Sequence, residues 1–90
     1  MHEFASVWEA IGRSPMEAAN LQARADLMNH LRKAIRGHTW TQAEAAKQCG
    51  VSQPRVNDLL NGKFHKFSLD ALVNMAGALG KRVIIELRAA

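Results

Sequence analysis

Two short helical segments separated by only three residues constrain the fold of this 90-residue chain more than any other feature. The first begins at Gln42, the second ends near Leu60, and Gly50-Val51-Ser52 separates them. A turn of this length sets two helices at a steep angle. Ala45 and Ala46 are small where the two helices must touch, so the spacing and the side-chain sizes agree.

Helix starts are marked by the S/T-x-x-E capping box, in which a hydroxyl and a carboxylate satisfy each other's free helix N–H groups. The pairs are Ser6 with Glu9, Ser14 with Glu17, and Thr41 with Glu44. They predict a short helix over residues 7–11, a long helix over residues 15–36 and a third helix from Gln42. Ser52 and Ser68 can cap a fourth helix and a fifth helix.

The long predicted helix carries one apolar stripe. Its apolar residues recur every three or four positions, at Leu21, Ala25, Met28, Leu31 and Ile35. This period places them on one helix face. We interpret the stripe as a core-facing surface and not as a cofactor site.

The last segment, residues 81–88, differs in kind. It is rich in β-branched residues, with apolar Val83, Ile85 and Leu87 on one face and charged Arg82, Glu86 and Arg88 on the other, which predicts a strand. No second segment of the sequence looks like a strand, and an unpaired strand leaves its backbone groups without partners. We therefore predict a homodimer in which two such strands pair, with an interface made by Val83, Ile84, Ile85 and Leu87. The alternative is a tail that lies along its own helices.

Length and composition predict one small, mostly α-helical domain over residues 1–90, because the chain is short and 48% hydrophobic. We divide it into N-terminal helices over residues 1–37, a core over residues 40–79 and the strand over residues 81–88. The apolar runs are far shorter than the roughly 20 residues that cross a bilayer. The N-terminus lacks a signal-peptide pattern, so we expect a cytoplasmic protein without a membrane partner. The single Cys49 is interpreted as a packing residue.

Positive charge is concentrated in the middle of the chain. Residues 30–66 carry seven basic side chains against two acidic ones, whereas the two ends are near neutral. A basic centre of this kind favours an anionic partner, nucleic acid first.

The central stretch resembles the lambda-repressor-like, or Xre, family of helix-turn-helix domains over residues 40–79. The resemblance rests on Gln42, Ala45, Ala46, Gly50, Val56, Leu59 and Asn61-Gly62-Lys63. It implies a five-helix domain that binds double-stranded operator DNA.

The second short helix would present its polar face to that DNA. With Val56 and Leu59 turned inward, the expected base-reading residues are Gln53, Pro54, Arg55, Asn57 and Asp58. The expected phosphate ligands are Gln42, Asn61, Lys63 and Lys66. The carboxylate of Asp58 would be repelled by phosphates unless it reads a base or neutralises Arg55.

The phrases SVWEAIG, TQAEAAKQCGVSQPRVNDLLNGK and FSLDALVNMAGALGKRV are similar to the HigA-like antitoxins with a C-terminal strand. This similarity implies a bacterial, nucleoid-associated autorepressor that binds and silences a RelE/HigB-like ribonuclease toxin, contacting it through residues 4–34. Two alternatives stay open. They are a stand-alone Xre-type regulator without a toxin partner and a protein-interaction module that does not bind DNA.

Catalytic and metal-binding motifs are absent from the sequence. The four histidines lack the spacing of a metal site, and no G-x-S-x-G, P-loop or GxGxxG pattern occurs. We expect no enzyme activity, no catalytic residues, no metal and no cofactor.

Overall fold

The computed structural model describes residues 11–89 and contains four α-helices and one 3-10 turn in that range. They are α2 (Pro15–Arg36), α3 (Gln42–Cys49), α4 (Gln53–Leu60), η1 (Phe64–Lys66) and α5 (Leu69–Ala78). The helix predicted over residues 7–11, with its Ser6/Glu9 capping box, lies outside the described residues except for Ile11, which is in a turn.

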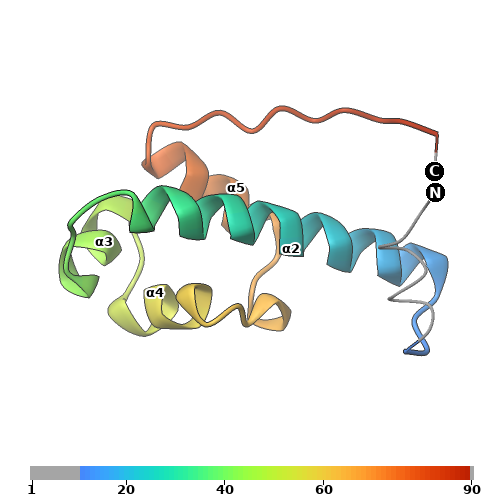
Figure 1. Ribbon diagram of the computed structural model, residues 1–90, viewed down its shortest axis with the longest axis horizontal. Helices are drawn as coiled ribbons and strands as arrows, with labels where there is room; N and C mark the ends of the chain where they lie inside the picture. Colours follow the sequence, from blue (N-terminus) through green and yellow to red (C-terminus); the bar gives the residue numbers. More distant parts are fainter. Residues whose placement is uncertain (1–10, 90) are drawn as a thin grey trace.

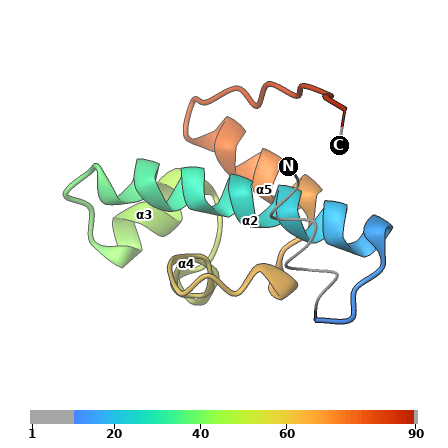
Figure 2. The same cartoon turned by 45° about the vertical axis from the view of Figure 1, so that its right-hand side comes forward.

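The long helix α2 runs through the length of the domain, and the shorter helices pack around its C-terminal part (Figure 1). Figure 2 shows α3 near the C-terminal end of α2, with α4 on the side away from the C-terminal segment. The predicted stripe is confirmed in α2 at Leu21, Met28, Leu31 and Ile35, which are buried. Ala25 is only half-buried.

A single apolar cluster joins the helices. Its largest fully buried side chains are Phe67, Met28, Leu59, Leu72, Met75 and Val56. They come from α2, α4, α5 and Phe67 between η1 and α5, so the core depends on side chains far apart in sequence. Burial of this apolar surface is the main driving force for holding the short helices in place.

The predicted helix starts are confirmed at α2, α3, α4 and α5. In α3, the backbone N–H of Thr41 donates to Oε1 of Glu44 at 3.0 Å, and the N–H of Glu44 donates to Oγ1 of Thr41 at 3.1 Å. Ser14 and Glu17 form the same capping box at α2. The hydroxyls of Ser52 and Ser68 accept from the third residue of α4 and of α5.

The turn between α3 and α4 has the geometry that its glycine allows. Gly50 has φ +68° and ψ +30°, the left-handed conformation that an L side chain rarely adopts. The N–H of Val51 then donates to the carbonyl of Ala46 at 3.0 Å, which closes the end of α3. This turn carries the chain directly into the capped start of α4.

The predicted C-terminal strand is wrong, and so is the fold class of five helices with one strand. Residues 81–89 form no strand, and the first of them, Lys81, makes the last backbone hydrogen bond of the described chain, to Ala76 at 2.9 Å. Ile84, Ile85 and Leu87 are 77%, 82% and 95% exposed. A strand needs a neighbouring strand for its backbone groups, and the described residues of this chain offer none.

Cys49 is buried in the apolar cluster, and desolvation by burial raises the pKa of its thiol. A thiol of this kind stays protonated and unreactive at neutral pH. The packing role expected from the sequence is therefore confirmed. Within residues 11–89, no helix has the length and apolar character needed to span a membrane.

Candidate nucleic-acid interface

Helix α4 has one buried side and one polar, exposed side. Val56 and Leu59 are 0% exposed, and they fix the helix against the core. Gln53, Pro54 and Asn57 are exposed on the other side. Three of the five expected base-reading residues are thus exposed, because burial of Val56 and Leu59 fixes the orientation of α4.

Arg55 is directed toward the chain that follows α4. Its Nη1 donates to the carbonyl of Lys66 at 2.8 Å, and its guanidinium carbon lies 4.0 Å from the ring centroid of Phe67. A guanidinium over an aromatic face gains cation–π attraction in addition to the hydrogen bond. The sequence predicted that Arg55 reads bases and did not indicate either of these two partners.

Asp58 is mostly covered, with 18% of its side chain exposed. Its Oδ1 lies 3.6 Å from Nζ of Lys63, and its Oδ2 lies 3.6 Å from Nζ of Lys66. The carboxylate thus pairs with two expected phosphate ligands and offsets part of their charge, and it does not pair with Arg55, as one alternative from the sequence had it.

Residues 61–67, here called the clamp loop, connect α4 to α5 and contain η1. Arg24 of α2 binds this loop, and Arg36 of α2 binds the last residue of α4 just before it. Nη1 of Arg24 donates to the carbonyls of Phe64 at 3.4 Å and Phe67 at 3.3 Å, and Nη2 of Arg36 donates to the carbonyl of Leu60 at 3.4 Å. With Arg55, three guanidinium groups therefore bind main-chain carbonyls in and next to the clamp loop.

These contacts change the interpretation of the central positive charge. Arg36 and Arg55 contribute to the basic excess of residues 30–66, yet both use hydrogen-bond donors on the protein's own backbone. Arg24 was missed by sequence reasoning altogether, because its partners are 40 and 43 residues away. The exposed cations at this surface are mainly lysines.

The remaining expected ligands lie at two places. Asn61, Lys63 and Lys66 are exposed on the clamp loop, and the two lysines are brought together around Asp58. Gln42 is exposed at the first position of α3. The expected dimer residues are separated, because Val83 packs against the core while Ile84, Ile85 and Leu87 are exposed.

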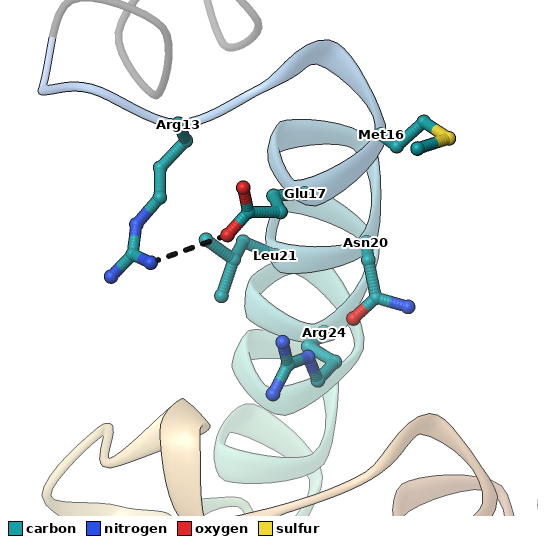
Figure 3. A pocket seen from close by; sticks show the side chains of 6 residues that line it. All are labelled: Arg13, Met16, Glu17, Asn20, Leu21 and Arg24. Atoms are coloured by element: carbon teal, nitrogen blue, oxygen red, sulfur yellow. Dashed lines mark hydrogen bonds and ion pairs between the residues drawn. The ribbon is translucent and has the colours of Figure 1, made fainter.

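A hollow lies along the N-terminal half of α2 and ends at Arg24, which also binds the clamp loop. Figure 3 shows its lining, which consists of Arg13, Met16, Glu17, Asn20, Leu21 and Arg24. Nη1 of Arg13 lies 3.5 Å from Oε2 of Glu17. Hydrogen bonds from Ser14, helped by the charge of Arg13, lower the pKa of Glu17.

Among residues 11–89, no cluster of three or more His, Cys, Asp or Glu side chains is placed to hold a metal ion.

A family model described as a helix-turn-helix domain matches residues 13–88 of the chain. It includes all four described α-helices and most of the C-terminal segment. No curated protein matches the chain. Helix-turn-helix domains are typically DNA-binding modules without enzyme activity, which indicates a sequence-specific DNA-binding regulator. The extent of the match shows that this chain belongs to the helix-turn-helix domain family.

Proposed function

We propose that the protein is a transcriptional repressor of the lambda-repressor-like, or Xre, type that reads operator DNA with α4. The observation that carries the proposal is the exposed face of α4, where Gln53, Pro54 and Asn57 lie opposite two fully buried anchors. The lysines of the clamp loop follow directly after this helix.

The chemistry of the exposed residues fits a major groove. Glutamine and asparagine pair bidentately with adenine, and the proline ring can contact a thymine methyl group. In a helix-turn-helix the N-terminal end of the second helix enters the groove, and Gln53 and Pro54 are the first two residues of α4. Gln42, Asn61, Lys63 and Lys66 would bind phosphates and fix the register on the duplex.

Binding to DNA across a salt series tests this function. The probe is the duplex that the protein itself selects from a library randomised over the length of two half-sites. We expect affinity to fall steeply with salt, and Lys63→Gln or Lys66→Gln to reduce the slope by about one each. Flat, weak retention at all salt concentrations would overturn the proposal and favour a protein-interaction module that does not bind DNA.

Substitution of Asn57 tests the reading role. Asn57→Ala should reduce discrimination at one base pair by roughly 5- to 150-fold, since one bidentate pair contributes about 1–3 kcal/mol. Asn74→Ala is the matched control, because Asn74 is exposed on α5. An unchanged base preference in Asn57→Ala would remove Asn57 from the reading surface.

We propose that the regulator acts as a homodimer held by the exposed apolar residues Ile84, Ile85 and Leu87, with Val83 at the edge of the contact. Exposed apolar side chains gathered in one segment are typical of an interaction site. A dimer would place two α4 helices on half-sites about one helical turn apart. This proposal does not require the segment to form a strand.

Charged substitutions test the dimer. Ile84→Lys with Ile85→Lys should shift sedimentation to the monomer and weaken operator binding more than the loss of one base contact. Val73→Lys is the control, because Val73 is also an exposed apolar residue but lies on α5. Operator binding that survives the double substitution would exclude this segment as the dimer contact.

We further propose that the protein is a HigA-like antitoxin that represses its own operon on the bacterial nucleoid and neutralises a RelE/HigB-like ribonuclease toxin. The support is the similarity of the sequence phrases quoted above. The exposed part of α2, with its hollow (Figure 3), is the candidate contact within residues 4–34. Co-purification with the products of neighbouring genes tests this role. A neighbour that does not encode a small basic ribonuclease-like protein would favour a stand-alone regulator.

A further inference from the structure

Both charged residues of α4 face the clamp loop. Asp58 contacts two of its lysines, and Arg55 contacts its last two residues. We infer that Arg55 and Asp58 are positioning residues that act on the clamp loop and do not read bases. Reading is then left to Gln53, Pro54 and Asn57. The inference rests on the DNA-binding function proposed above.

The geometry of Asp58 argues against base reading. A carboxylate reads cytosine by accepting a hydrogen bond from the N4 amine. Each oxygen of Asp58 already faces an ammonium group at 3.6 Å, and little of the side chain is exposed. An approach to a base would require both ion pairs to rearrange.

The charge of Asp58 has a second effect. Lys63 and Lys66 are 44% and 47% exposed, so their ammonium groups are accessible to phosphates. One carboxylate between them offsets part of their positive charge and holds both on the same side of the loop. Because phosphate contacts do not depend on sequence, Asp58 limits the affinity for any DNA and leaves base preference unchanged.

Arg55 is occupied in a similar way. Bidentate recognition of guanine needs a free edge of the guanidinium group. Nη1 of Arg55 donates to the carbonyl of Lys66, and the guanidinium carbon lies 4.0 Å from the ring centroid of the buried Phe67. Arg55 therefore connects the reading helix to the core and to the carbonyl of a phosphate-binding residue.

Selection from the randomised duplex library separates reading from positioning. Asp58→Asn should select the same sequences as the wild type, while its affinity becomes more salt-dependent by up to about one unit of slope. Asn57→Ala should change the selected sequence and is the matched comparison on the same helix. Loss of preference at a single base pair in Asp58→Asn would overturn the inference.

A coupling test shows whether Asp58 acts through the lysines. In a background of Lys63→Gln and Lys66→Gln, Asp58→Asn should leave the salt slope unchanged, because the groups that it offsets are gone. A change in slope that persists in this background would also overturn the inference. A merely structural role of Asp58 would not depend on the two lysines.

Two substitutions test Arg55. Arg55→Lys and Arg55→Met should lower the affinity for selected and random duplexes by the same factor, with an unchanged selected sequence. Thermal unfolding shows whether both variants are folded. If Arg55→Met does not fold, the selection experiment relies on Arg55→Lys. A lost preference at one G·C pair would identify Arg55 as a base-reading residue.

The inference and the proposed function can fail separately. If the wild type selects no sequence and binds without salt dependence, the DNA-binding function is wrong. If the wild type selects a sequence and Asp58→Asn or Arg55→Lys changes it, only the positioning role is wrong.

Discussion

The helix-turn-helix segment of residues 42–60 and the C-terminal segment of residues 81–89 both carry strong local signals, but only one of them forms the element that its signal predicts. In the first, a capping box, a left-handed glycine and a capping serine produce α3 and α4. In the second, the consecutive β-branched residues Val83, Ile84 and Ile85 produce no strand within the described chain.

The two segments differ in where their hydrogen-bonding and packing partners lie. The caps of α3 and α4 are satisfied within a few residues, and Val56 and Leu59 are buried by neighbouring helices of the same chain. The backbone of a strand needs partners on another strand, and its apolar face needs a surface. The C-terminal segment has an apolar contact with the core at Val83 and leaves its other large apolar residues exposed.

The largest effect should come from the core. Leu59→Ala removes a 0% exposed side chain between the helices and should cost about 2–5 kcal/mol of unfolding free energy. Leu87→Ala removes a 95% exposed side chain and should change the stability of the monomer by less than about 0.5 kcal/mol. Urea denaturation of both variants at low protein concentration measures the difference. A large loss of unfolding free energy in Leu87→Ala would mean that the C-terminal segment packs against the helices.

The next effect should come from the turn. Gly50→Ala forces an L side chain into φ +68° and should cost about 1–2 kcal/mol, although nothing lies within 4 Å of the added Cβ. Gly77→Ala has equal space but lies inside α5, so it should stabilise the protein by about 0.5–1 kcal/mol. Thermal unfolding of the pair isolates backbone conformation from packing. Equal effects on stability would show that the left-handed backbone conformation does not disfavour a side chain at position 50.

A smaller effect is expected at the start of α3. Thr41→Ala removes the hydroxyl that accepts from the N–H of Glu44 and should cost about 1 kcal/mol. Thr39→Ala is the control, because Thr39 is exposed and lies before the cap. Equal stability of the two variants in urea would show that the capping box contributes little to the fold.

The smallest effect should be a change in pH dependence. The N–H and hydroxyl of Thr41 lower the pKa of Glu44 below its ordinary 4.5. The carboxylate therefore stabilises the fold above about pH 4.5, and this contribution is lost as pH falls through the lowered pKa. Glu44→Gln should flatten the stability curve on the acid side, measured by urea denaturation at several pH values. If Glu44→Gln and the wild type lose stability equally as pH falls, the lowered pKa of Glu44 does not contribute to the pH dependence.

The features that were predictable from the sequence have local causes. The helix starts at Ser14, Thr41, Ser52 and Ser68 and the turn at Gly50 follow from hydrogen bonds and φ angles within a few residues. Exposure of Gln53, Pro54 and Asn57 also followed, because helical periodicity fixes them opposite the apolar anchors.

The roles of the charged residues depend on the folded arrangement of the chain. Arg24 and Arg36 bind carbonyls 24 to 43 residues away, and Arg55 and Asp58 contact a loop whose path no local pattern describes. The absence of the strand from the described chain was decided in the same way. A cap or a turn is satisfied by its own neighbours, whereas an arginine, a carboxylate or a strand takes the partner that the folded chain brings to it.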